Sequence, residues 1–150
     1  TFNPHIGYVT LFPLMFGYLD SKSDEFYNLL RILASGDELN SYYGIRSLSK
    51  NDLLYHTGED YWRGNIWINM NYLTLRGLYL YYKSNSEAFE LYNSLRNKIV
   101  LTVFNEWKRT GTFYEQYSDV DGKGLKANPF NGWTSLIVNI ITENYDQEIF

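Results

Sequence analysis

Hydrophobic positions along the chain follow two alternating patterns. Residues 6–19 and 66–82 are apolar nearly all round, whereas residues 24–34 and 86–108 each carry one apolar stripe opposite a polar face. A fifth segment, from about 134 to 144, is again densely apolar. A helix that is apolar all round is buried, and a helix with a single stripe covers a core. The order inner, outer, inner, outer, inner predicts an all-α fold of helical hairpins stacked in two layers.

The connections between these predicted helices differ in length. Those near residues 20–23 and 83–85 are short, while those from about 35 to 65 and from 109 to 133 are long and rich in Tyr, Trp, Gly and Asn. Long loops in a compact domain are commonly functional or disordered, and disordered segments favour Ser, Lys and Glu instead. If the hairpins stand side by side, both long loops emerge where the inner helices begin. We therefore expect the functional site at that end.

Chain length limits the architecture. The 150 residues are 45% hydrophobic and 20% charged, which is the balance of a packed domain. A closed ring of six helical hairpins needs roughly 300 residues or more, so five helices supply a little under half of one. We expect residues 1–150 to be part of a larger domain whose upstream part is absent. The inner helices then leave apolar surface uncovered unless that part packs there.

Charge and residue types exclude several classes of function. The net charge is −4 without a basic block, which argues against nucleic acid as a partner. The chain has no Cys and only two His, His5 and His56, so we expect no metal site and no cofactor. Residues 6–19 are too few to cross a bilayer, which takes roughly 18 or more apolar residues. A membrane anchor would therefore have to lie outside this chain.

Five separated motifs carry a family resemblance. They occur in order at residues 5–13 (HIGYVTLFP), 43–49 (YGIRSLS), 61–73 (YWRGNIWINMNYL), 113–117 (FYEQY) and 129–136 (PFNGWTSL). Together they resemble the C-terminal part of the catalytic domain in the processing α-glucosidases, the mannosyl-oligosaccharide glucosidases of glycoside hydrolase family 63. The likeness runs from His5 to about Tyr145. A more distant likeness to trehalases is confined to the carboxylate-Lys/Gln-Tyr and Gly-Trp-Thr motifs. Trehalases differ at a third motif, where they have Gln-Trp-Asp and this chain has Tyr61-Trp62-Arg63.

The resemblance implies a fold, an activity and a site. The fold is the C-terminal portion, about five helices, of an (α/α)6 toroid barrel. The activity is inverting removal of the terminal α-1,2-linked glucose from the triglucosylated high-mannose N-glycan precursor in the lumen of the endoplasmic reticulum. Inversion uses two carboxyl groups roughly 6.5–9.5 Å apart. The general base of the family falls on Glu115, and the general acid lies upstream of Thr1. The partners implied are an N-linked oligosaccharide and the upstream half of the same domain, and the chain alone is expected to be inactive.

The residues around Glu115 support a base without the family. Glu115 stands between aromatic residues in a strand-like stretch of a site-facing loop, and aromatic surfaces stack on sugars. If Thr134 or Ser135 caps the fifth helix, its dipole favours the ionised carboxylate that a base requires. The alternative from the residues alone is a Glu that is hydrogen-bonded across a hairpin. The nearby segment 119–124 is expected to be a hairpin turn, since Lys123 occupies what would be a calcium-ligand position.

Other loop residues are candidates for contact with substrate. Tyr61, Trp62 and Arg63 combine stacking surfaces with a guanidinium that can hold sugar hydroxyls or a loop carbonyl. Arg46 is balanced between a substrate contact and a loop-fixing salt bridge. Trp133 either walls the site or secures the start of the fifth helix. Trp67 is expected in the core, and the adjacent acids Glu59 and Asp60 are interpreted as a solvated loop edge outside the catalytic set.

Three classes of function remain open from the sequence. The first is the exo-acting α-glucosidase described above. The second is a glycan-binding helical module without turnover, which the lack of an upstream acid would favour. The third is a trehalase-like hydrolase of a free disaccharide, against which Trp62-Arg63-Gly64 argues.

Overall fold

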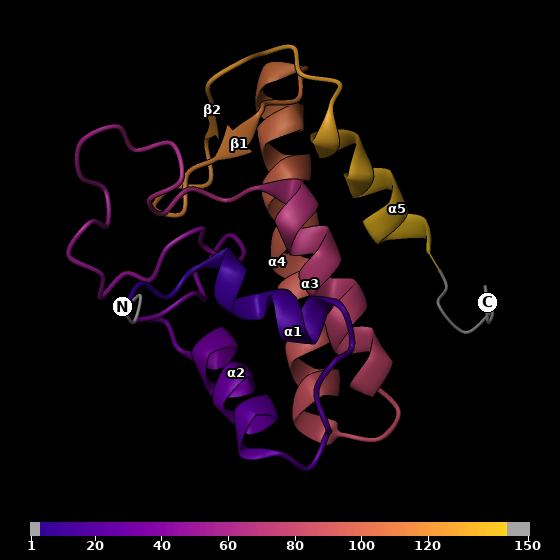
Figure 1. Cartoon of the computed structure of the whole chain (residues 1–150). Coiled ribbons are helices and arrows are strands. Elements are labelled where there is room, and N and C mark those ends of the chain that lie inside the picture. The colour runs from indigo at the N-terminus through magenta and orange to yellow at the C-terminus, as the bar shows by residue number, and fades with distance from the viewer. Residues whose placement is uncertain (1–3, 144–150) are drawn as a thin grey trace.

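The computed structural model describes residues 4–143, and helices dominate it (Figure 1). Two 3-10 helices, η1 and η2, and two very short strands accompany five α-helices in this range. In chain order the elements are η1 (Tyr8–Leu11), α1 (Phe12–Met15), α2 (Asp24–Ala34), α3 (Ile68–Tyr81), α4 (Ser86–Thr110), β1 (Gln116–Tyr117), β2 (Gly124–Leu125), η2 (Trp133–Leu136) and α5 (Ile137–Thr142). The all-α prediction is confirmed.

The two striped helices form where the sequence predicts them. In α2 the Ser23 hydroxyl accepts a hydrogen bond from the Phe26 amide at 3.2 Å, so the helix begins at Asp24. In α4 the Asn85 side chain accepts from the Ala88 amide at 2.9 Å, and Gly111 ends the helix with a φ of 77°. Both helices bury one stripe, which in α2 consists of Phe26, Leu29, Leu30 and Leu33. Their outer placement follows from that single apolar face.

Helix α3 is the inner element around which the others pack. It contacts α1, α4, α5 and η2, and its buried residues lie on more than one side. At Gly77 a Cβ atom would lie 2.5 Å from the Leu14 carbonyl oxygen, so glycine permits the close crossing of α1 over α3. The helix begins two residues later than predicted, because Ile66 is extended and pairs with Arg46 and Tyr117.

The prediction of one buried helix over residues 6–19 is wrong. The segment forms the short η1 and α1, with Pro13 in the first turn of α1 and Gly17 at a φ of 69° just after its end. Val9 and Tyr18 are 74% and 81% exposed. The apolar run without a periodic stripe favoured one buried helix, and the breaks fall at Pro13 and Gly17, which are helix-boundary residues.

The fifth predicted helix is shorter than expected. It begins as η2 and continues as α5, which ends at Thr142, and residue 144 of the prediction lies outside the described residues. The expected cap is also wrong: the Thr134 hydroxyl donates to the Tyr114 carbonyl at 2.6 Å, and the Ser135 hydroxyl donates to the Gly132 carbonyl at 2.7 Å. Neither side chain caps the helix, because both are used to hold neighbouring backbone.

Both long loops lie at the same end of the helices, away from the short connections α1–α2 and α3–α4 (Figure 1). Backbone bridges join them: Arg46 pairs with Ile66, Ile66 pairs with Tyr117, and Tyr117 in β1 pairs with Gly124 in β2. The expected hairpin turn over residues 119–124 is confirmed by this antiparallel pair. The predicted site face is therefore one connected layer of loops.

Several large apolar side chains stay exposed in the described part of the chain. They occur on the N-terminal segment, on α3, on α4 and on α5, and include Phe16, Tyr18, Leu80, Leu101, Phe104, Val138 and Ile141. Such surface agrees with the expectation that further protein packs here. Within residues 4–143, no helix combines the length and hydrophobicity that a bilayer span requires.

Candidate active site

Glu115 stands directly before β1 and is half-buried. Its carboxylate accepts a hydrogen bond from the Tyr61 hydroxyl at one oxygen and from the Ala127 amide, at 3.3 Å, at the other. Its backbone amide also donates to the Ala127 carbonyl at 3.0 Å. The cross-hairpin bond that the sequence left as an alternative is thus present, and it coexists with the link to Tyr61. The two donors orient the carboxylate while it remains partly open to solvent.

Tyr61 joins the two long loops at this point. Its hydrogen bond to Glu115, together with burial, raises the pKa of the Tyr61 phenol, so the hydroxyl stays protonated and donates. The Lys126 ammonium lies 5.7 Å from the centre of the Tyr61 ring. Fifty-four positions separate Tyr61 from Glu115 in the sequence, and the structure brings these two predicted site residues together.

Aromatic rings cluster next to Tyr61, with Trp67 at their centre. Trp62 stacks on Trp67 with ring centroids 3.6 Å apart and planes 7° apart. Tyr61 meets Trp67 edge-on at 4.7 Å, and Trp133 lies 5.5 Å from it. Trp67 is 1% exposed, which confirms its expected place in the core. Trp62 is 47% exposed and so presents its outer face for stacking.

Trp133 takes both roles that the sequence left open. Its indole N–H donates to the Glu115 carbonyl at 2.7 Å, and its ring packs on Phe130 at 4.7 Å. Trp133 therefore lies beside Glu115 and at the same time fixes the start of η2 to the segment directly before β1.

A groove of about 410 Å³ borders the exposed Trp62. Its other walls are mostly apolar and come from the N-terminal segment, the loop before α3 and α3 itself: His5, Gly7, Tyr8, Val9, Phe12, Ser47, Leu48 and Met70. A flat aromatic face beside such a groove suits the apolar face of a sugar ring.

The two candidate arginines hold loops in the described structure. The Arg63 guanidinium donates to the Thr57 carbonyl at 2.7 Å, which is the loop-carbonyl contact considered for it. Arg46 is buried, and its Nε lies 2.6 Å from an Asp119 carboxylate oxygen. Its Nη1 donates to the carbonyls of Gly36 and Asn40. For Arg46 these contacts correspond to the loop-fixing salt bridge rather than to the substrate contact.

The sequence analysis missed a charged cluster between the α2–α3 loop and the β1–β2 turn. His56 lies between two carboxylates: Nδ1 contacts Asp60, and Nε2 is 2.8 Å from Asp119. Burial lowers the pKa of His56, but hydrogen bonds to Asp60 and Asp119 outweigh it and raise the pKa above the ordinary value. Asp60 is therefore ion-paired and not a solvated loop edge. Because 63 positions separate His56 from Asp119, no local pattern in the sequence indicates the cluster.

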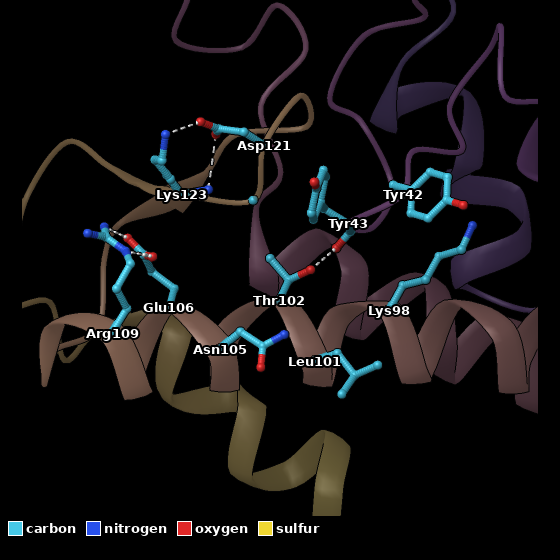
Figure 2. Close-up of a pocket in the computed structure, with 11 residues that line it drawn as sticks. Tyr42, Tyr43, Lys98, Leu101, Thr102, Asn105, Glu106, Arg109, Asp121 and Lys123 are labelled. Carbon is cyan, nitrogen blue, oxygen red and sulfur yellow. Dashed lines mark hydrogen bonds and ion pairs between the residues drawn. The ribbon is translucent and has the colours of Figure 1, made fainter.

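A second groove, of about 500 Å³, contains none of the predicted site residues (Figure 2). It lies between α4, Tyr42, Tyr43 and the β1–β2 turn. Two ion pairs line it, since Arg109 binds Glu106 at 2.6 Å and Lys123 binds Asp121 at 2.7 Å, while the Lys98 ammonium donates to the Asn40 side chain at 2.7 Å. Glu106 also accepts from the Gly124 amide at 2.8 Å, which anchors the hairpin to α4. The role that these contacts show for the groove residues is structural, because Glu106 holds the β1–β2 hairpin that follows Glu115.

Metal-binding geometry does not accompany these clusters. Within residues 4–143, His, Asp and Glu side chains form no group of three or more that is arranged to hold a metal ion. The chemistry that the site offers is that of an oriented carboxylate among aromatic rings.

Comparison with known proteins assigns this sequence to a family. The model of the "Glycosyl hydrolase family 63 C-terminal domain" matches residues 1–143. A "Probable mannosyl-oligosaccharide glucosidase" of Schizosaccharomyces pombe is 50% identical over 146 residues, covering 94% of this chain and 18% of that protein. The "Mannosyl-oligosaccharide glucosidase" of Saccharomyces cerevisiae is 35% identical over 145 residues, covering 91% and 17%. This chain thus spans less than a fifth of the length of both relatives.

A solved structure shares the fold. The GH63 mannosylglycerate hydrolase from Thermus thermophilus, in complex with glucose, superposes with a TM-score of 0.68 at 21% identity, over 93% of this chain and 32% of that chain. This likeness concerns the fold alone. By the match of the family model over nearly the whole sequence and by its close relatives, this chain belongs to glycosyl hydrolase family 63, in the region of the family's C-terminal domain.

Proposed function

We propose that this chain is the C-terminal section of the catalytic domain of an inverting mannosyl-oligosaccharide glucosidase, with Glu115 as its general base. The substrate is a triglucosylated high-mannose N-glycan, from which the terminal α-1,2-linked glucose is removed. The observation that carries the proposal is the carboxylate of Glu115, which accepts hydrogen bonds from Tyr61 and Ala127, while the indole of Trp133 holds the Glu115 backbone carbonyl. The relatives named above support the substrate class.

The chemistry assigns Glu115 one proton transfer. Glu115 removes a proton from a water molecule while the water oxygen bonds to the anomeric carbon of glucose. The bond from that carbon to the leaving sugar oxygen breaks, and the leaving oxygen takes a proton from a general acid. That acid lies in the upstream part of the domain. A carboxylate held by two donors meets the requirement that a base keep one orientation relative to its water.

Substrate contacts fall on the loop before α3 and on Trp133. Trp62 offers its exposed face to a sugar ring, and the groove beside it accommodates the next residue of the glycan. The Tyr61 ring and the Arg63 guanidinium offer further contacts to sugar at the same edge, and Trp133 closes the wall beside Glu115. Arg46 stabilises these loops through its buried ion pair with Asp119.

The likeness to mannosyl-oligosaccharide glucosidases supports a role in the secretory pathway, and we propose the lumen of the endoplasmic reticulum as the site of action. The upstream half of the same catalytic domain is its structural partner, and it covers the exposed apolar side chains of α1 and α5. Neither a cofactor nor nucleic acid enters this proposal.

Replacement of the base tests the proposal in the full-length protein that contains this chain. Glu115→Gln keeps the size of the side chain and removes its ability to accept a proton. We expect release of glucose from an α-1,2-glucosylated glycan to fall by about 10²–10⁴-fold, the range for a lost acid–base group, while glycan binding by calorimetry persists.

Glu59→Gln is the matched control, because Glu59 is an exposed carboxylate in the neighbouring loop. We expect it to retain activity. Turnover that survives Glu115→Gln but is lost with Glu59→Gln would move the base to that loop. A full-length protein that binds the glycan and releases no glucose would instead identify a non-catalytic glycan-binding module.

A further inference from the structure

Asp119 is the buried centre of a cluster that joins the two long loops. Its carboxylate is fully shielded from solvent and accepts hydrogen bonds from Arg46 at 2.6 Å, Tyr55 at 2.6 Å and His56 at 2.8 Å. Arg46, Tyr55 and His56 come from the long loop that joins α2 to α3, and Asp119 comes from the β1–β2 turn. Burial and the bond to Asp119 raise the pKa of Tyr55 to about 12, so Tyr55 serves here as a donor.

The cluster lies next to the Tyr61–Glu115 pair along both chain segments. Asp119 follows Glu115 by four residues, through the strand β1. Asp60, which binds the other nitrogen of His56, immediately precedes Tyr61. The Asp60 carbonyl also accepts from the Asn65 side chain at 2.7 Å. The position of Tyr61 relative to Glu115 therefore depends on the link from Asp60 through His56 to Asp119.

Charge balance favours a proton on His56. The groups facing His56 are Asp60 and Tyr55 in its own loop and Asp119 from the hairpin, and Arg46 faces Asp119 from the other side. Two carboxylates against one guanidinium leave one negative charge, which a protonated imidazole cancels. Only the protonated ring donates from both nitrogens, since a neutral ring turns a lone pair toward one of the carboxylates.

We propose that Asp119 and His56 are positioning residues, which hold the Tyr61 loop against Glu115 while His56 is protonated. This rests on the proposed function, in which Glu115 is the base. Neither residue touches the substrate. We call the link from Asp60 through His56 to Asp119 the clamp. The folded-state pKa of His56 lies above the ordinary value of 6.5, so the stability that the clamp contributes is fully present below about pH 6.5 and is lost as pH rises through the folded pKa.

Asp119→Asn in the full-length protein tests the clamp, with Asp121→Asn as its control. Asp121 lies in the same turn, is exposed and pairs only with Lys123 among the ion pairs of the described residues. A misplacement of about 1 Å costs on the order of 100-fold in rate, so we expect Asp119→Asn to lower kcat about 100-fold with a smaller change in KM. Asp121→Asn stays within twofold of the unmodified protein.

Hydrogen exchange provides a readout that does not need turnover. Peptides covering residues 52–64 exchange faster in Asp119→Asn than in Asp121→Asn, after correction for intrinsic rates. If the unmodified protein released no glucose, the proposed function would fail while this measurement would still decide the clamp. Equal exchange in the two variants, or a kcat of Asp119→Asn within twofold, overturns the inference.

His56→Gln covers the case in which Asp119→Asn does not fold. His56 is partly exposed at the cluster edge, and Gln keeps a hydrogen-bonding side chain without a titrating charge. In the unmodified protein, we expect protection of residues 52–64 to decline as the pH rises above about 6.5. In His56→Gln this decline disappears, and the alkaline limb of the kcat profile shifts. An unchanged pH dependence in the variant contradicts the proposal.

Discussion

Tyr61→Phe isolates the contact between the two long loops. The substitution removes the hydroxyl that donates to Glu115 and leaves the ring, which still meets Trp67 edge-on at 4.7 Å. A hydrogen bond to a charged group contributes about 1.5–3 kcal/mol. Because Tyr61 is only half-buried, the lower figure applies, and about 1.5 kcal/mol corresponds to about a tenfold change in rate. We therefore expect kcat to fall about tenfold.

Steady-state kinetics of glucose release by the full-length protein measure this effect. Tyr42→Phe is the control, since Tyr42 is 88% exposed and lines the second groove, which contains none of the predicted site residues. It should leave kcat and KM unchanged. If Tyr61→Phe raised KM tenfold with kcat intact, Tyr61 would bind the sugar uniformly and would not orient the base. If neither constant changed, the contact would have no part in catalysis.

Two further results are expected. Asn71→Ala removes the side chain that accepts from the Ile45 amide at 2.8 Å and donates to the Trp67 carbonyl at 2.8 Å, and leaving such buried groups unpaired costs about 1–3 kcal/mol. Thermal unfolding should show a lowered midpoint for Asn71→Ala and a nearly unchanged one for Asn93→Ala, which is partly exposed; equal midpoints would contradict the anchoring role. The 150-residue chain alone should release no glucose and should self-associate in sedimentation, because its apolar faces are uncovered. An active monomer of this length would refute both halves of that expectation.

Periodic stripes and caps explain why some elements were predictable. Helix α2 occupies the residues that its stripe indicates, and Ser23 marks its start. Helix α4 extends two residues beyond the prediction, to the left-handed Gly111. The apolar segment 6–19 had no stripe to reveal its breaks, and its exposed side chains reflect surface that other protein is expected to cover. The pattern of apolar positions does not distinguish side chains buried within this chain from side chains that another part of the protein covers.

The site divides in the same way. Motif order and loop length predicted that Tyr61, Trp62, Glu115 and Trp133 share one end of the molecule, and the structure brings them together there. The Asp119 cluster could not be predicted, because its members come from two loops far apart in the sequence and Asp119 itself looked like an ordinary turn residue. Backbone bridges from Arg46 through Ile66 to Tyr117 help to bring those loops into register. Tertiary ion pairs of this kind depend on the fold and not on local spacing.

The anomeric configuration of the first glucose released tests the central claim most directly. Proton NMR of the full-length protein acting on an α-1,2-glucosylated glycan distinguishes the two anomers before they interconvert in water. A base at Glu115 that activates water on the face opposite the leaving sugar gives β-glucose first, and Glu115→Gln abolishes that signal. Initial release of α-glucose would mean a retaining mechanism with a covalent intermediate, and it would contradict the role assigned to Glu115.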